Sequence, residues 1–172
     1  VTQWPNVELW SKQVNAAGGR NVGGKKMMVE IIEYDDKTNP GEHIKAAQRL
    51  AEVDKVDFII APYGTGFNLA AAPIYAKYNY PHIGVSAISD KMPELTARYD
   101  NLFFTLGNTT SFTDSVIDIL KDMRDAGTIG NRVAMVNVAD AFGIELAEAA
   151  RPKIKEAGFD IVYDKSYPLG TP

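Results

Sequence analysis

The amino-acid sequence predicts an α/β protein with parallel β-sheets flanked by helices. Segments with helical apolar spacing alternate with short β-branched runs along most of the chain, which is typical of such sheets. A polar break at 107–110 interrupts this alternation, and a longer helical pattern follows it. We therefore expect two lobes, with 1–108 as the first lobe and 109–172 as the beginning of the second.

The overall composition is that of a soluble globular protein. Of 172 residues, 45% are hydrophobic and 23% are charged, and the net charge is −4 without a basic stripe, so nucleic-acid binding is not expected. No apolar run approaches the length of a membrane span, and there is no cysteine for a disulfide or a thiolate metal site. Val1 opens directly into a helical pattern, so we expect no signal peptide within this sequence.

The first elements are a helix and a strand. A helix is expected at about 5–17, where Gly18–Gly19 ends it, and a strand at about 26–34, ending in Asp35–Asp36. The apolar face of this helix is expected to contain Val7, Trp10, Val14 and Ala17.

The second helix has the clearest start signal in the sequence. Asn39 is a suitable N-cap, Pro40 suits the first helical position, and Glu42 places an acid in the first turn. The residues expected in its buried face are Ile44, Ala47, Leu50 and Ala51.

Short apolar runs predict the remaining strands of the first lobe. Residues 56–60 are continuous and β-branched, so we expect a strand that is buried on both faces. A tight turn at 62–66 leads into a helix through 68–77, and further strands are expected at 82–85 and 102–106.

The second lobe continues the alternation. A helix is expected at 111–126, closed by Gly127, followed by a strand at 132–138, a helix at 143–157 and a strand at 159–167. The apolar face of the first of these helices is expected to contain Phe112, Val116, Ile119, Leu120 and Met123.

Candidate ligand contacts lie in four turns that follow strands, because ligands of open parallel sheets bind outside the carboxyl ends of the strands. These turns are 34–36, 63–66, 86–89 and 140–143.

The turn at 63–66 is the most informative of the four. Gly64 and Gly66 allow a sharp turn with unencumbered N–H groups, Thr65 adds a hydroxyl, and a helix begins directly afterwards. This combination suits a small anion such as a carboxylate. The alternative is that the glycines only shape a short connection. Neither the dinucleotide fingerprint nor a phosphate-loop lysine motif is present.

Other polar candidates favour structural roles. Asp35–Asp36 has no recognisable third metal ligand, and the isolated His43 and His82 do not form a site. No hydrolase nucleophile motif is present, so we expect no catalytic residue. Tyr63 and Phe142 lie at strand ends, which suits the wall of a ligand crevice, with packing of a loop on its own domain as the alternative.

Several short motifs resemble those of the leucine/isoleucine/valine-binding protein family, the type I periplasmic binding proteins. They are Val14–Gly19, Tyr34–Asp36 with Pro40, Phe58–Ala61 through Pro73–Tyr75, Pro93–Thr96 and Phe142–Gly143. Their order and spacing cover nearly the whole chain. The resemblance implies two Rossmann-like lobes that are joined by crossing strands and close on a small ligand. The family begins with a strand where this chain begins with a helix, and the second lobe has few elements before the sequence stops after Tyr167, so we expect both lobes to be incomplete.

The resemblance also implies ligand-binding positions. Thr65 falls where a hydroxyl receives the ligand carboxylate, Ser86 and Ala87 fall where the polar head of the ligand is held, and Phe142 falls where an aromatic ring covers it. Ile88 departs from the threonine frequent in the family, which weakens the expectation of an α-amino group there. The expected ligand-binding residues are Tyr63, Gly64, Thr65, Gly66, Ser86, Ala87, Ile88 and Phe142.

By resemblance, the protein is expected to be the extracytoplasmic solute-binding receptor of an ABC importer that delivers its ligand to a membrane permease. The expected ligand is a small carboxylate, such as an aliphatic or aromatic amino acid or an aromatic or other organic acid. We expect a periplasmic or membrane-tethered protein with an upstream signal, monomeric when complete, without cofactor or metal. A ligand-sensing regulatory domain of the same fold is the first alternative, and a nucleotide-dependent enzyme is the second, since fold alone does not decide function.

Overall fold

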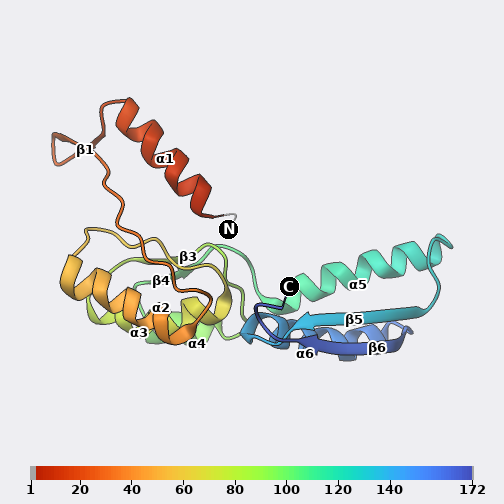
Figure 1. Cartoon of the computed structure of the whole chain (residues 1–172). Coiled ribbons are helices and arrows are strands. Elements are labelled where there is room, and N and C mark those ends of the chain that lie inside the picture. Colours follow the sequence, from red (N-terminus) through yellow and green to blue (C-terminus); the bar gives the residue numbers. More distant parts are fainter. Residues whose placement is uncertain (1–2, 172) are drawn as a thin grey trace. The chain divides into compact units, whose positions relative to one another are not determined.

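The computed structural model describes residues 3–171, which divide into two compact units, one ending at Asp35 and one beginning at Asp36. Figure 1 shows the helices and strands in chain order. The lobe boundary that the sequence suggests near Asn108 lies inside the second unit and stays a prediction.

The first unit consists of one helix and a short hairpin. Helix α1 (Trp4–Ala16) ends before Gly18–Gly19, whose φ angles are both +82°. Strands β1 (Arg20–Val22) and β2 (Lys25–Met27) pair antiparallel. A Cβ atom on the second of these glycines would clash with the carbonyl of Met27, so only glycine fits between the helix and the hairpin.

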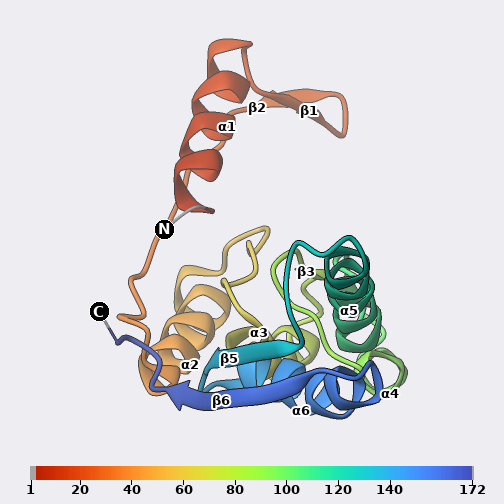
Figure 2. The ribbon, with the colours of Figure 1, turned by 90° about the vertical axis from the view of Figure 1, so that its right-hand side faces the viewer.

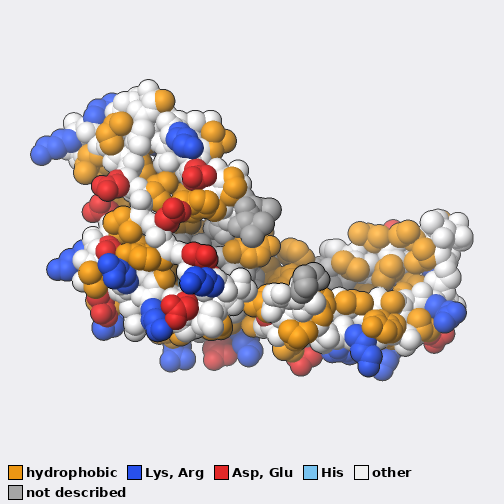
Figure 3. Space-filling view, in the orientation of Figure 1, with side chains coloured by type: hydrophobic (Ala, Val, Ile, Leu, Met, Phe, Trp, Pro, Cys, Tyr) orange, Lys and Arg blue, Asp and Glu red, His pale blue; other side chains and the backbone are white. Residues whose placement is uncertain are grey.

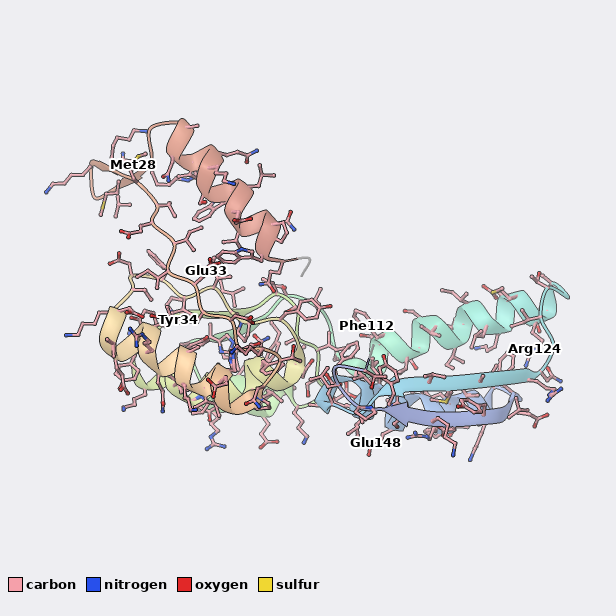
Figure 4. The ribbon with its side chains drawn as sticks, viewed as in Figure 1. Met28, Glu33, Tyr34, Phe112, Arg124 and Glu148 are labelled. Carbon is pink, nitrogen blue, oxygen red and sulfur yellow. The ribbon has the colours of Figure 1, made fainter. Side chains whose placement is uncertain are left out.

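The strand expected at 26–34 is wrong over most of its length. Only its first residues belong to β2, and 28–36 carries no strand ladder. The Asn15 side chain instead holds the backbone of Val29, donating to its carbonyl and accepting from its N–H at 2.8 Å each. The segment therefore lacks the regular ladder hydrogen bonds that define a strand. Figure 4 labels Met28, Glu33 and Tyr34 along this segment.

The second unit begins with a capped helix. Helix α2 (Pro40–Arg49) continues into the π-helical turn η1 (Leu50–Asp54). The N-cap prediction is confirmed, because the Asn39 side chain accepts from the N–H groups of Gly41 and Glu42 at 2.9 and 3.1 Å. Of the residues expected in its buried face, Ala47 and Ala51 are buried, Leu50 is half-buried and Ile44 is exposed.

The strand expected at 56–60 is also wrong. Phe58 is 77% exposed and Ile60 is 52% exposed, and the segment carries no ladder. The physical reason is again the lack of a neighbouring strand among the described residues. An apolar, β-branched run indicates a strand that is buried in a sheet, but it does not supply the sheet.

A two-stranded parallel sheet lies in the first half of this unit. Both expected strands form here as β3 (His82–Gly84) and β4 (Leu102–Phe104), and they pair with each other. Helix α3 (Thr65–Lys77) packs against α2 and β3. Helix α4 (Met92–Arg98) has no counterpart among the expected elements, although proline and an acid occupy its first turn. The core between α2 and α3 consists of Ala47, Ala71, Ile74 and Tyr75.

The second half of this unit is a helix–strand–helix–strand segment. It contains α5 (Thr109–Asp125), β5 (Arg132–Val138), α6 (Ala141–Glu156) and β6 (Asp160–Tyr167). Strands β5 and β6 are parallel, as predicted, and lie side by side in Figures 1 and 2. The core residues that join both helices to the strands are Ile117, Ile154 and Phe159.

The apolar face expected for α5 is largely exposed. Thr109, Thr113 and Ile117 are buried instead, because α5 turns this narrower face toward α6. Hydrophobic side chains are visible at the surface over this part of the chain in Figure 3. The exposed residues are Phe112, Val116, Ile119 and Met123, with exposed fractions of 44%, 55%, 58% and 37%.

Candidate functional site

The first part of the candidate site is the turn that opens α3. Gly64 has a φ of +94° and is the N-cap of the helix, a conformation that glycine adopts without strain. Its N–H donates to Oγ of Ser86 at 3.1 Å, and that hydroxyl donates to the carbonyl of Pro62 at 3.2 Å. The turn at 63–66 and the loop after β3 are therefore held together, although no strand precedes the turn at 63–66.

Thr65 makes the second link between these two segments. Its side chain is completely buried, and its hydroxyl donates to the carbonyl of Ile88 at 3.1 Å and accepts from the N–H of Ile88 at 3.2 Å. Ala87 and Ile88 are themselves buried. A hydroxyl has a single hydrogen to donate, so direct donation to a ligand requires Thr65 to leave the Ile88 carbonyl.

The first turn of α3 offers donors that the protein does not use. The first intrahelical hydrogen bond of α3 runs from the N–H of Asn68 to the carbonyl of Gly64. Helix geometry leaves the preceding N–H groups without intrahelical partners, and no described residue accepts from those of Thr65, Gly66 or Phe67. Thr65 has no exposed surface, so the half-buried Gly66 and Phe67 are the ones whose N–H groups, together with the positive end of the helix dipole, can receive an anion.

The start of α6 is the third part of the site. Asp140 caps this helix by accepting from the N–H of Gly143 at 2.8 Å, and a Cβ atom on Gly143 would clash with the carbonyl of Val138. A Cβ atom on Gly66 would lie 3.7 Å from Cβ of Ala141, so the starts of α3 and α6 are in van der Waals contact distance. Phe142, which follows in α6, is 38% exposed.

The structure also contains a carboxylate cluster that sequence reasoning missed. Glu145 in α6 accepts from Oγ of Ser89 at 3.0 and 3.1 Å, from the N–H of Asp90 at 2.6 Å and from Oγ1 of Thr109 at 3.0 Å. Asp90 in turn accepts from the N–H and hydroxyl of Thr110 at 3.0 and 2.8 Å. These residues are far apart in sequence and form no motif, so only the fold brings them together.

The other candidates have structural partners. Asp36 accepts from the N–H of Thr38 at 2.8 Å and lies 3.2 Å from Nδ1 of buried His43, which agrees with the structural interpretation of both. Burial lowers the pKa of His43, although the Asp36 carboxylate opposes this shift. Tyr63 is 67% exposed. Within residues 3–171, no group of three or more acidic or histidine side chains is arranged for a metal ion.

Two hollows in the surface lie away from the candidate site. One of about 350 Å³ is lined by residues of α4 and β4, and one of about 460 Å³ lies between α5 and α6. Neither includes an expected ligand-binding residue. No helix within the described part of the chain has the length and apolar character needed to cross a membrane.

Known proteins share both the fold and the sequence pattern. The branched-chain amino acid transporter substrate-binding protein LivJ from Streptococcus pneumoniae, solved with isoleucine, is 23% identical with a TM-score of 0.70, over 95% of this chain and 43% of that one. A solute-binding protein of an ABC transporter from Rhodopseudomonas palustris BisB5, solved with 3,4-dihydroxybenzoic acid, is 26% identical with a TM-score of 0.70, over 94% and 42%. Both support the type I periplasmic binding protein fold expected from the sequence.

The sequence relatives lead to the same family. The Leu/Ile/Val-binding protein homolog 7 of Brucella suis biovar 1 is 25% identical over 96% of this chain, which spans 41% of the length of that relative. The family model described as periplasmic binding protein matches residues 3–172. The chain therefore belongs to the periplasmic binding protein family, and the resemblance to its leucine/isoleucine/valine-binding members is confirmed.

Proposed function

We propose that the whole protein is the extracytoplasmic solute-binding receptor of an ABC importer and that it binds a small carboxylate. The observation that carries this proposal is the pair of unused N–H groups of the half-buried Gly66 and Phe67 at the start of α3. They lie at a turn that Ser86 and Ile88 hold in place, next to the start of α6. A carboxylate is the small ligand whose charge and acceptor oxygens match such a set.

The ligands of the two solved relatives support this ligand class. One was solved with isoleucine and the other with 3,4-dihydroxybenzoic acid, which share a carboxylate and differ in the rest of the molecule. The carboxylate is therefore the common feature that a shared turn would recognise. For this chain we propose an aliphatic or aromatic amino acid, or an aromatic or other organic acid.

Within the site, each expected residue has a proposed role. The N–H groups at Gly66 and Phe67 bind the carboxylate, while Thr65, Ser86 and the Ile88 backbone fix the turn at Gly64. The buried Ala87 belongs to the same loop. The exposed aromatic rings suit contact with the rest of the ligand, and they belong to Tyr63 and Phe142.

The family supports the proposed partner and location. A receptor of this kind acts outside the cytoplasmic membrane and delivers its ligand to the membrane permease of the importer. We propose that it works without a cofactor and as a monomer. An output domain fused to the full-length protein would instead favour the sensing role.

A thermal-shift screen of the full-length protein tests the proposal. The probes are leucine, isoleucine and 3,4-dihydroxybenzoate. A ligand at 100 times its dissociation constant stabilises the folded state by about 2.7 kcal/mol, which raises the melting temperature measurably. The proposal predicts a shift with at least one probe. If none of these acids, nor a wider panel of amino acids and aromatic acids, raises the melting temperature, the carboxylate assignment is wrong.

A further inference from the structure

A buried amide and a buried imidazole lie directly behind the turn that opens α3. Asn68 and His82 are 0% and 1% exposed, and Nε2 of His82 is 2.9 Å from Oδ1 of Asn68. The Asn68 amide nitrogen donates to the carbonyls of Pro62 and Gly64, both at 2.8 Å. Neither side chain belongs to the expected set of ligand-binding residues.

The hydrogen-bond pattern fixes the chemical state of this pair. The two amide hydrogens of Asn68 are used by the two carbonyls, so its Oδ1 atom is an acceptor and Nε2 of His82 must carry a hydrogen. The opposite ring nitrogen, Nδ1, is buried and has no partner among the described residues, which fits an unprotonated nitrogen. His82 therefore acts as a neutral donor with its hydrogen on Nε2.

The surrounding residues leave room for this arrangement. A Cβ atom on Gly84 would lie 3.3 Å from Oδ1 of Asn68 and 3.2 Å from the Phe104 ring, a tighter approach than most side chains tolerate. The Tyr75 ring packs edge-on against His82 with 4.8 Å between ring centroids. The strand and the helix therefore hold the imidazole and the amide in one position.

This pair controls the direction of the N–H groups in the turn. In a trans peptide the carbonyl and the N–H of one unit point in opposite directions. Tethering the Gly64 carbonyl to Asn68 thus fixes the direction of the Thr65 N–H, and tethering the Pro62 carbonyl fixes that of the Tyr63 N–H. Gly64 adds little steric restraint of its own, because glycine reaches many backbone conformations.

We infer that Asn68 and His82 are positioning residues of the carboxylate site. The buried Asn68 amide orients the turn, and the His82 imidazole holds that amide in place. This inference rests on the proposed function, since the turn is taken as the place where a carboxylate binds. It assigns a role in ligand affinity to two residues for which sequence analysis indicates only structural roles, Asn68 within a helix and His82 as an isolated histidine.

The test compares Asn68→Ala with the matched variant Asn101→Ala in the full-length protein. Asn101 also donates from a side-chain amide to a backbone carbonyl, that of Tyr80 at 2.7 Å, but at the amino end of β3, away from the turn. Calorimetric titrations use isoleucine and 3,4-dihydroxybenzoate as probes. We expect Asn68→Ala to weaken binding about tenfold, equivalent to about 1.4 kcal/mol, and Asn101→Ala to change it less than about twofold.

Both variants are expected to lower the melting temperature, so stability alone does not distinguish them. Equal effects on affinity, or parent-like affinity in folded Asn68→Ala, overturn the inference. If Asn68→Ala does not fold, His82→Leu removes only the supporting donor and should weaken binding, while His82→Gln restores a donor and should recover most of it. Loss without recovery in His82→Gln also counts against a positioning role.

Hydrogen exchange in the ligand-free protein separates this inference from the choice of ligand. The N–H of Gly64, bonded to Ser86, should exchange faster in Asn68→Ala than in the parent and Asn101→Ala. If the parent binds no acid of the thermal-shift panel but exchange accelerates, the ligand class is wrong and the role in positioning the turn stands. Unchanged exchange at the turn overturns the positioning role whichever ligand binds.

Discussion

At the scale of single residues, the Thr65 hydroxyl has a structural role in addition to its proposed role in ligand binding. It bonds both backbone groups of Ile88 and so joins the start of α3 to the loop after β3. The sequence identified Thr65 as a contact for the ligand carboxylate, and this role stays a prediction. The structure adds an indirect effect of Thr65 on ligand binding, because loss of its hydrogen bonds to Ile88 would disturb the turn.

Thr65→Val is expected to weaken carboxylate binding about 10- to 150-fold, equivalent to about 1.5–3 kcal/mol, through loss of a hydrogen bond to a charged group or of the bonds that hold the turn. Thr65→Ser keeps the hydroxyl and should be much milder. Calorimetric titration of both full-length variants with isoleucine and 3,4-dihydroxybenzoate provides the measurement. Parent-like affinity in Thr65→Val would place the carboxylate elsewhere.

His82 should make stability depend on pH. Burial lowers the pKa of its imidazole to about 4 from its usual value of about 6.5, with a smaller contribution from His43. The unfolded chain then binds more protons between these values, so the free energy of unfolding falls as the pH drops from 6.5 toward 4. The full loss for this one group is about 3 kcal/mol.

The comparison for this prediction is His82→Gln, which keeps a donor and removes the titration. Denaturant unfolding of parent and variant at pH 7, 5.5 and 4.5 should show a steeper loss in the parent. His43 is present in both proteins, so the difference between them reports His82 together with its small interaction with His43. Parallel losses in the two proteins would mean that His82 is not buried as a neutral group.

At the scale of elements, local signals succeeded where they depend on a few neighbouring residues. The cap at Asn39, the glycines that end α1 and α5, and the parallel pairs β3–β4 and β5–β6 agree with the sequence. The predictions of strands at 26–34 and 56–60 are wrong because a strand also needs a partner strand, which local sequence does not identify. The prediction of the buried face of α5 is wrong because periodicity locates an apolar stripe but does not identify what packs against it.

In the candidate site too, features set by neighbouring residues were predictable and those set by distant contacts were not. The glycine turn and the loop at 86–89 are recognisable from their place after predicted strands, and the structure brings them together. The supports behind them are not recognisable, since Asn68, His82 and Glu145 match no motif. Their roles arise from contacts between elements, which periodicity and turn chemistry do not encode.

Glu145 provides a test at this scale. Its carboxylate accepts from Ser89, Asp90 and Thr109, so it joins α6 to the loop before α4 and to the start of α5. Glu145→Ala leaves these donors without their acceptor and should lower the free energy of unfolding by about 1.5–3 kcal/mol. Glu148→Ala, one turn along the same helix at an exposed position labelled in Figure 4, should change it by no more than about 0.5 kcal/mol.

Chemical unfolding of the two full-length variants measures this difference. An effect in Glu145→Ala no larger than that in Glu148→Ala would show that the cluster contributes nothing to stability. Glu145→Gln keeps the size of the side chain and should fall between the two, because it retains an acceptor without the charge.

At the scale of the whole molecule, the chain spans 41% of the length of the Brucella suis relative. In this part of the chain, apolar side chains are exposed along α5 and also at Val136 of β5 and Val162 of β6. A two-lobed receptor closes on its ligand by rotation at a few element-terminal residues, and the segment before α5 is the place where the sequence suggests such a boundary.

Closure predicts a smaller radius of gyration when ligand is bound. Small-angle scattering of the full-length protein, with and without a saturating probe that binds in the thermal-shift screen, measures it directly. A tightly bound probe with no change in the radius of gyration would argue against two lobes that move about this segment.

The central claim is that the N–H groups at the start of α3 form an anion site, and a comparison of acids with their neutral amides tests it most directly. The full-length protein is titrated with isoleucine and isoleucinamide, and with 3,4-dihydroxybenzoate and 3,4-dihydroxybenzamide. Charge-assisted hydrogen bonds predict that the acid of the binding pair is favoured by at least about tenfold, equivalent to about 1.4 kcal/mol. Equal affinity for acid and amide would contradict the claim and leave the glycines of this turn with a purely structural role.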